Sequence, residues 1–259
     1  MVSHDSADNE NERRVYDEVR DEVRDTVSGM NVLLGNLRSH SVPMADGLAN
    51  LRRDASNLVT QAQVLGDPLL KVVTHRLNEY VADLKATAAG EIDEVEVFVA
   101  KIERLVDGEA VPEADVPQVV RALPAKRAPD IDFSIVKKNV EILLVVPEKA
   151  LARIVERELA ACGYRTSAVR DAFVALETVV RTRPDLVVAS MELGVLSGVD
   201  LGCALAAMPA TDGIPFAVLT SYEWGNPKLR GLPPRAAVIR KGAMFGDDLA
   251  ESLARFGIT

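Results

Sequence analysis

Four prolines fall within one short segment near the middle of this chain. The segment, residues 107–130, reads DGEAVPEADVPQVVRALPAKRAPD and shows no sustained hydrophobic period. Because proline lacks a backbone N–H and obstructs the preceding helical turn, we do not expect a helix to cross this segment. The spacing of apolar residues also differs on its two sides. We therefore predict two domains joined by a proline-rich linker over residues 109–138, which suits a length of 259 residues.

Before the linker, apolar residues recur every three or four positions in four stretches, as on amphipathic helices. Pro43, Gly66 and Gly90 separate the stretches. In the first stretch, the sequence DEVRDEVRD places acids within reach of arginines on the outer face. Helices with such short connections pack side by side in opposite directions. The sequence predicts an antiparallel four-helix bundle over residues 11–108, preceded by a disordered polar tail over residues 1–10.

After the linker, short β-branched runs alternate with helical stretches. This alternation predicts a parallel sheet with helices on both faces. We expect a five-stranded, doubly wound α/β domain of the flavodoxin-like type over residues 139–259. The last crossover, residues 221–235, contains three prolines and two glycines and leaves room for a turn or two of helix. The predicted strands are 141–146, 164–169, 185–190, 216–220 and 236–240.

The charge is distributed unevenly between the two halves. Residues 1–130 contain 24 acids and 15 bases, whereas residues 131–259 contain 15 of each, so the first half carries the net charge of -9. An acidic surface disfavours nucleic acid and acidic lipid as partners. The polar start of the chain and the lack of a long apolar run predict a cytoplasmic protein without a signal peptide. Cys162 and Cys203 are expected to be small apolar residues in helices.

Three segments of the second half resemble the receiver domain of bacterial two-component response regulators. PDLVVASMELGVLSGVDL, residues 184–201, is similar to the third strand of that family and the loop and glycine that follow it. VLTS at 218–221 and IRKG at 239–242 are similar to the ends of the fourth and fifth strands. The resemblance implies Mg²⁺-assisted phosphoryl transfer to an aspartate on the third strand. It also implies a metal-binding pair of acids, a hydroxyl that contacts the phosphoryl group and a lysine that pairs with its charge.

This chain lacks the acidic groups of that chemistry. Ser190 stands at the acceptor position, and Val146 and Pro147 stand at the acidic pair, with Glu148 one position further on. A serine hydroxyl without an activating base is a poor acceptor, and Mg²⁺ with few carboxylates is held weakly. We expect no phosphorylation at Ser190, no metal and no cofactor.

The hydroxyl and the lysine of the family pattern are retained as Thr220 and Lys241. Thr220 is expected to bond to the backbone at its strand end. Lys241 could be solvated, salt-bridged or part of a retained site. Glu192 could place negative charge near Lys241, or it could be an exposed loop acid.

The sequence LRRDASNLVTQAQVLGDPLLKVVTHRLNEYVADL, residues 51–84, resembles the histidine-containing phosphotransfer domain. In that family a helix carries a phosphoryl-accepting His, a Lys three positions later and then a Gly. Here Ser56, Val59 and Thr60 stand at those positions. His75 is expected to be a capping or packing residue, and no cluster of His, Cys or acids has metal-ligand spacing.

We predict from these patterns a non-enzymatic signalling adaptor that docks a histidine kinase, a phosphotransferase or a response regulator without carrying phosphate. Its docking surface would be Arg52, Arg53, Ser56 and Val59 on the bundle, and either residues 150–159 or the last strand and helix of the receiver-like domain. One alternative is a homodimeric structural or localisation platform, assembled through the long first helix. Another is residual phosphotransfer with an unrecognised acceptor.

Overall fold

The computed structural model describes residues 3–85, 89–125 and 138–258. The chain divides into two compact units, residues 1–124 and 125–259, which we call the helical unit and the sheet unit. Within the described residues, no helix is both long and apolar enough to cross a membrane.

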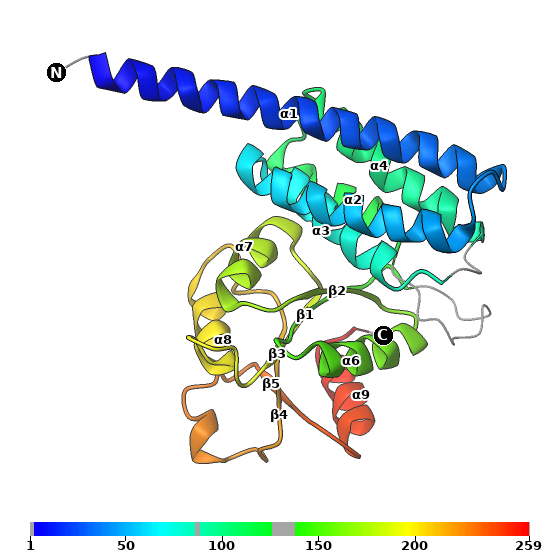
Figure 1. Cartoon of the computed structure of the whole chain (residues 1–259). Coiled ribbons are helices and arrows are strands. Elements are labelled where there is room, and N and C mark those ends of the chain that lie inside the picture. Colours follow the sequence, from blue (N-terminus) through cyan, green and yellow to red (C-terminus); the bar gives the residue numbers. More distant parts are fainter. Residues whose placement is uncertain (1–2, 86–88, 126–137, 259) are drawn as a thin grey trace. The chain divides into compact units, whose positions relative to one another are not determined.

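The helical unit contains the four predicted helices, which pack as a bundle (Figure 1). The turn between the second and third helices shows how the sequence sets their ends. Gly66 adopts φ 73°, a left-handed conformation that suits a residue without a side chain. Asp67 then caps the next helix by accepting a hydrogen bond from the Leu70 N–H at 2.7 Å, and Pro68 occupies its first turn. The four helices are α1 (Ser3–Arg38), α2 (Met44–Leu65), α3 (Pro68–Ala82) and α4 (Ile92–Val106).

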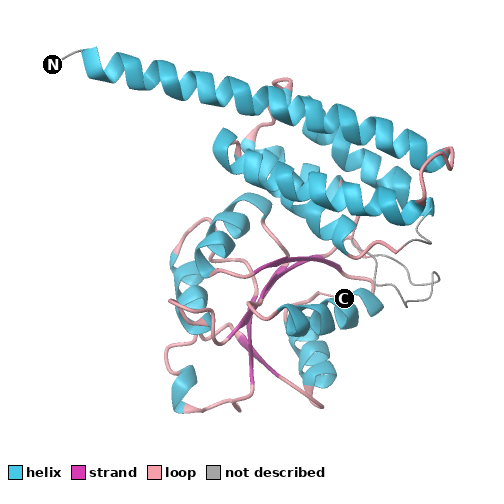
Figure 2. Cartoon of the chain, viewed as in Figure 1, coloured by secondary structure: helices cyan, strands magenta, loops and turns pink. Residues whose placement is uncertain are grey.

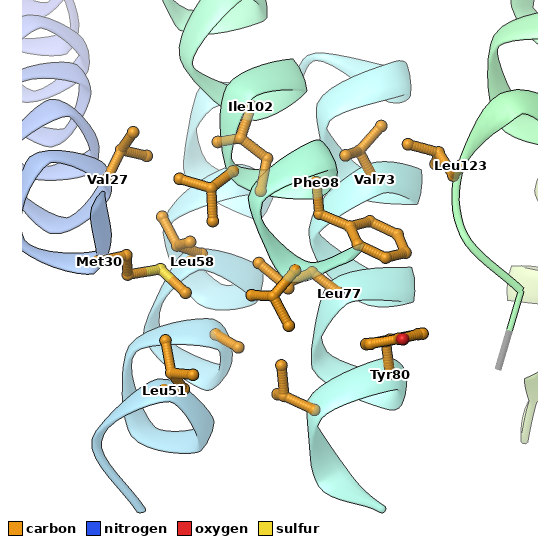
Figure 3. Packing of buried hydrophobic residues seen from close by; sticks show 14 of the residues in the cluster. Val27, Met30, Leu51, Leu58, Val73, Leu77, Tyr80, Phe98, Ile102 and Leu123 are labelled. Atoms are coloured by element: carbon orange, nitrogen blue, oxygen red, sulfur yellow. The ribbon is translucent and has the colours of Figure 1, made fainter. Parts of the chain in front are cut away.

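The apolar stripes of these helices meet in one core, shown in Figure 3. Phe98 is among its largest fully buried side chains, and its ring lies 5.4 Å from that of Tyr80. The predicted helical bundle is thereby confirmed. Other core residues labelled in Figure 3 are Val27, Met30, Leu51, Leu58, Val73, Leu77 and Ile102.

The first helix is longer than its sequence pattern predicted. It begins at Ser3, whereas a disordered tail was expected over residues 1–10, of which residues 1 and 2 lie outside the described part. No proline or glycine interrupts residues 3–28, and ion pairs one turn apart, such as Arg20–Asp17 at 2.9 Å, favour the helix. Val15 is apolar but 42% exposed, so burial in the core begins further along the helix.

The first part of the predicted linker belongs to the bundle. After the single turns η1 (Ala89–Glu91) and η2 (Glu113–Asp115), a short helix α5 (Val116–Ala122) places Val116, Val120 and Leu123 in the bundle core. The prolines permit this helix because Pro117 lies in its first turn, where no backbone N–H is needed. Residues 126–137 of the linker lie outside the described residues.

The sheet unit is a five-stranded parallel sheet in the order β2-β1-β3-β4-β5, which confirms the predicted flavodoxin-like fold. Helices α6 and α9 pack on one face, and α7 and α8 pack on the other (Figures 1 and 2). Every residue of β1, β3 and β4 is buried, because these inner strands are covered on both faces. The strands are β1 (Glu141–Val145), β2 (Arg165–Val169), β3 (Leu186–Ser190), β4 (Phe216–Thr220) and β5 (Ala237–Arg240). The helices are α6 (Lys149–Ala161), α7 (Ala172–Thr182), α8 (Gly198–Ala207) and α9 (Phe245–Arg255).

Two details of the sheet unit bear on the predictions. The crossover from β4 to β5 contains only the single turn η3 (Pro227–Leu229), as its prolines and glycines indicated.

The two cysteines were expected to be apolar packing residues in helices, but both are exposed. Cys162 lies just beyond the end of α6, and Cys203 lies on the outer side of α8.

Candidate functional site

The residues that match the receiver pattern meet at the carboxyl-terminal edge of the sheet. Ser190 and Thr220 are the last residues of β3 and β4, and Lys241 follows β5 directly. The helices after β1 and β3 lie on opposite faces of the sheet, so the connections that leave these two neighbouring strands turn in opposite directions at this edge. Such a switch point is where doubly wound sheets bind ligands. We therefore take this edge, which we call the loop edge, as the candidate site.

At the acceptor position, the Ser190 hydroxyl is closed off from solvent. Ser190 is 1% exposed, and its Oγ has no hydrogen-bond partner among the described residues. Val146 continues the register of β1 beside Ser190 and is also 1% exposed. An apolar side chain thus lies where the receiver pattern has a carboxylate. A buried hydroxyl without a base has neither the access nor the activation that a nucleophile needs.

A glycine contact helps to enclose Ser190. The first residue of α8, Gly198, donates its N–H to the Met191 carbonyl at 2.8 Å. A Cβ placed on Gly198 would lie 2.5 Å from the Ser190 carbonyl oxygen, so only glycine allows this approach. This close contact explains why the position of the family's glycine is occupied by glycine in this chain as well.

The retained hydroxyl and lysine are held by the backbone. Thr220 is 1% exposed, and its Oγ1 accepts a hydrogen bond from the Tyr222 N–H at 3.1 Å. The Lys241 N–H donates to the Thr220 carbonyl at 2.8 Å, while the residue itself is half-buried. Glu148 is exposed at the start of α6 and makes no capping hydrogen bond there. The structure therefore brings Ser190, Thr220 and Lys241 to neighbouring strand ends, and after β1 Glu148 is the acid that follows Val146 and Pro147.

Glu192 is exposed on the loop after β3, as one of the two expectations for it had it, and Lys228 is a basic residue in its electrostatic surroundings. Lys228 donates a hydrogen bond to the Tyr222 hydroxyl at 2.5 Å, and its ammonium lies 4.8 Å from the centre of that ring. This hydrogen bond, together with attraction from Tyr222 and Glu192, raises the pKa of Lys228 above its ordinary value. Glu192 is thus part of the charge environment of Lys228, on the loop between β4 and β5.

An ion pair that the sequence did not reveal lies at the end of β5. The Arg240 guanidinium donates to both carboxylate oxygens of Asp248, at 2.8 and 2.7 Å, and the Arg240 N–H donates to the same carboxylate at 2.9 Å. These hydrogen bonds hold the pKa of Asp248 below its ordinary value, against the opposing effect of burial. Because β5 is an edge strand, its outward N–H groups have no neighbouring strand to bond to. The Asp248 carboxylate accepts a hydrogen bond from one of them, the N–H of Arg240.

The Asp248 carboxylate should make the stability of the parent depend on pH, and its replacement should remove this dependence. A carboxylate whose pKa is lower in the folded state stabilises the fold above its unfolded pKa, and this stabilisation disappears as the pH falls through the folded pKa. Asp248→Asn should lower the free energy of unfolding by about 1–2 kcal/mol at neutral pH. The difference from the parent should shrink as the pH falls below about 4. Urea unfolding at several pH values measures it, with the exposed neighbour Asp247→Asn as control, and a difference independent of pH would contradict this assignment.

In the bundle, the phosphotransfer-like positions lie on α2. Ser56 and Thr60 are exposed, Val59 is half-buried, and the Thr60 hydroxyl donates weakly to the Ser56 carbonyl at 3.4 Å. None of these side chains offers a nitrogen nucleophile. The nearby third helix carries His75, which is half-buried and lies 3.8 Å from the Glu79 carboxylate one turn away. The predicted capping or packing role of His75 is compatible with that placement.

Of the predicted docking residues, Arg52 has a structural role. Its guanidinium donates to the Val81 carbonyl at 3.1 Å and to the Leu84 carbonyl, and so ties α2 to the end of α3. Arg53 is exposed and lies 3.5 Å from the Asp54 carboxylate. Arg53, Ser56 and Val59 thus remain as a candidate surface, whereas Arg52 helps to build the bundle. Among the residues with described positions, no group of three or more His, Cys, Asp or Glu is placed to hold a metal.

The comparisons with known proteins concern the fold of the sheet unit. No family model matches the chain, and no curated protein matches it. A similar solved structure is the receiver domain of a sensor histidine kinase from Pseudomonas aeruginosa PAO1, at 22% identity over 46% of this chain and 98% of that chain, with a TM-score of 0.41. Another is a chemotaxis response regulator of Vibrio cholerae, at 18% identity over 45% and 98%, with a TM-score of 0.40. A receiver domain from Methylobacillus flagellatus is 19% identical over 45% and 98%, with a TM-score of 0.39.

Proposed function

We propose that this chain is a non-catalytic adaptor of two-component signalling, which binds a histidine kinase, a phosphotransferase or a response regulator without carrying a phosphoryl group. The proposal combines the receiver-like sequence segments with their places at the ends of β3, β4 and β5 in a sheet of order β2-β1-β3-β4-β5. The observation that carries it is the burial of Ser190 at the acceptor position beside the apolar Val146. This burial supports a receiver-like sheet that binds partners without accepting a phosphoryl group.

The residues at the loop edge do not fit the Mg²⁺ that receiver chemistry requires. Magnesium prefers oxygen ligands in octahedral geometry and is usually held through carboxylates. Val146 is buried and apolar, Pro147 offers no side-chain oxygen, and Glu148 is exposed at the start of α6. These residues therefore do not support a metal-assisted step at this edge.

Docking does not need the lost groups, because a protein interface depends on shape and apolar contact around the acceptor. On the sheet unit, Ile154 is 51% exposed on α6, within the segment that the sequence indicated as a docking helix. On the helical unit, exposed Ser56 and half-buried Val59 lie on one face of α2. If either surface binds a partner protein, a charged side chain introduced at its centre should weaken that binding.

Calorimetry of the full chain with purified histidine kinases, phosphotransferases and response regulators of the same organism tests the proposal. We expect one of them to bind, and Ile154→Asp or Ser56→Arg to weaken that binding about tenfold or more, as at an interface hot spot. Val97→Arg serves as the control, since Val97 is 46% exposed on α4, a helix that carries neither candidate surface. All three variants should unfold at the parent temperature. Absence of binding to every such protein would refute the adaptor role.

A further inference from the structure

A groove lies on the face of the sheet unit that α6 and α9 cover (Figure 1). Its volume is about 310 Å³, and its mostly apolar lining comes from the end of α6, from α9 and from the chain next to them. Small-molecule sites have volumes of about 300–1,000 Å³ and apolar linings with a few polar groups. The groove therefore has the dimensions of a site for a small ligand. Its apolar residues include Phe245, Leu249, Leu253 and Ile258.

Small residues on α9 keep the groove open. Gly246, Ala250 and Ala254 follow each other at intervals of four, so they share one side of the helix, and all three line the groove. Each of them is exposed, whereas Leu249 and Leu253 beside them are buried in the core. A Cβ placed on Gly246 would meet no atom within 4 Å. The open space is therefore set by the sequence of α9, above a core that is closed.

The groove follows α9 over most of the length of this helix. From Gly246 to Ala254 the helix advances by about 12 Å, at about 1.5 Å per residue. An unbranched chain of about ten carbons, with bonds of about 1.5 Å, has a similar extended length. An apolar chain lying here would be removed from water along its contact with the helix, which favours its binding.

A lysine is held at the end of the groove where α9 ends. The Lys138 ammonium donates a hydrogen bond to the Tyr164 hydroxyl at 3.2 Å and lies 4.6 Å from the centre of that ring. Tyr164 is buried, and its hydroxyl donates in turn to the carbonyl of Ile258, just beyond α9, at 3.4 Å. An ammonium group has three N–H donors, so Lys138 can bind a carboxylate and keep its bond to Tyr164. The groove thus combines an apolar wall with a positioned positive charge.

An acid, Glu158 near the end of α6, also lines the groove. It is exposed, and its carboxylate lies 3.8 Å from the Arg157 guanidinium. Water screens an exposed charge, so Glu158 opposes an anionic ligand only weakly. The charge beside the buried Tyr164 is that of Lys138, and an anionic head group fits there.

We propose that the groove binds a medium-chain carboxylate, with an unbranched chain of about ten carbons. Its carboxylate accepts a hydrogen bond from Lys138, and its chain lies along Gly246, Ala250 and Ala254. This binding is independent of the adaptor role, because the residues that line the groove belong neither to the receiver pattern nor to α2.

Calorimetry of the full chain with octanoate, nonanoate and decanoate, each below the concentration at which it forms micelles, tests the proposal. We expect one ligand per chain. The affinity should rise up to about fourfold with each added carbon, since each further methylene is removed from water. Octanol and octyltrimethylammonium have the same chain as octanoate without its negative charge, and both should bind more weakly. If either of them bound as tightly as octanoate, the role of Lys138 would be refuted.

The two cysteines of the chain locate the ligand. Cys162 lines the groove, whereas Cys203 lies on α8, on the other face of the sheet, and both are exposed. Alkylation by iodoacetamide, a neutral reagent, followed by peptide mass spectrometry measures the reaction rate of each thiol. Decanoate at ten times its dissociation constant should slow the reaction of Cys162 about tenfold and leave that of Cys203 unchanged. An unchanged rate at Cys162, or equal slowing of both thiols, would overturn the proposal.

Lys138→Gln tests the charged end of the site. It should weaken the binding of octanoate about fivefold and leave that of octanol unchanged. Lys149→Gln is the matched control, because Lys149 is exposed at the start of α6 and does not line the groove. A preference for octanoate over octanol that survives in Lys138→Gln would contradict the assignment.

Ala250→Phe tests the apolar wall by placing a large side chain in the groove. It should weaken the binding of decanoate more than about tenfold, as expected when the space for the chain is filled. Ala206→Phe, at an exposed alanine on α8, is the control and should bind decanoate as the parent does. All variants should unfold at the parent temperature. Binding of decanoate that persists unchanged in Ala250→Phe would show that the ligand lies elsewhere.

Discussion

Ser190→Asp, which restores the acceptor residue of the receiver family, should destabilise the sheet unit by about 3–5 kcal/mol, as expected for an uncompensated buried charge. The reason is that Ser190 is 1% exposed and its hydroxyl has no hydrogen-bond partner in the part of the chain that the structure describes. An aspartate side chain at this position would be larger than serine and negatively charged. Its neighbour Val146 is apolar, so no metal-binding acid stands beside it as in the receiver pattern. Either its charge is buried at high cost or the site must open.

Urea unfolding measures this effect, and Ser190→Ala is the matched control. Alanine removes a buried hydroxyl that has no partner, so its free energy of unfolding should stay within about 1 kcal/mol of the parent. An open, solvated acceptor site would instead accommodate aspartate with little loss. If Ser190→Asp were as stable as Ser190→Ala, the closure of this site would be refuted.

Gly198→Ala should destabilise the sheet unit by about 3 kcal/mol, at the upper end of the usual cost of overpacking. The new Cβ would lie 2.5 Å from the Ser190 carbonyl oxygen, and a backbone atom at the end of a buried strand cannot move aside cheaply. Either α8 shifts away from the sheet or the end of β3 is displaced. Both changes break the contact that encloses Ser190.

Gly213→Ala provides the comparison for this second substitution. A Cβ at Gly213 would meet no atom within 4 Å, so we expect its effect on the free energy of unfolding to be within about 0.5 kcal/mol. Chemical unfolding of the two variants in parallel separates the steric effect from the general effect of adding a methyl group. Equal small losses for both would show that the approach of Gly198 to Ser190 is not tight.

The parts of the fold that follow from local pattern were predictable. The inner strands are continuous apolar runs because helices cover both of their faces. Each helix carries one apolar stripe, which packs into a single hydrophobic core. Helix α5 was missed because its prolines were read as a break, although Pro117 lies where a helix tolerates it. The start of α1 was missed because a polar sequence resembles a disordered one, even where it can form a helix.

The candidate site was predictable only in outline. Parallel strands end at one edge, so the positions of Ser190, Thr220 and Lys241 in their strands were enough to place them together. Ion pairs and hydrogen bonds between residues of different elements could not be predicted, because no spacing in the local sequence indicates which residues will meet. The Arg240–Asp248 pair joins a strand to a helix, and Arg52 on α2 donates to carbonyls 29 and 32 residues further along the chain, at and just beyond the end of α3.

The most direct test of a non-catalytic sheet unit is intact mass spectrometry after incubation with acetyl phosphate and Mg²⁺. An ordinary response regulator in the same reaction serves as the positive control, and Ser190→Ala identifies the position of any adduct. We expect the parent chain to keep its unmodified mass while the control protein gains a phosphoryl group. A phosphoryl adduct on this chain, above all one lost in Ser190→Ala, would show that it still carries phosphate and would contradict the adaptor proposed for it.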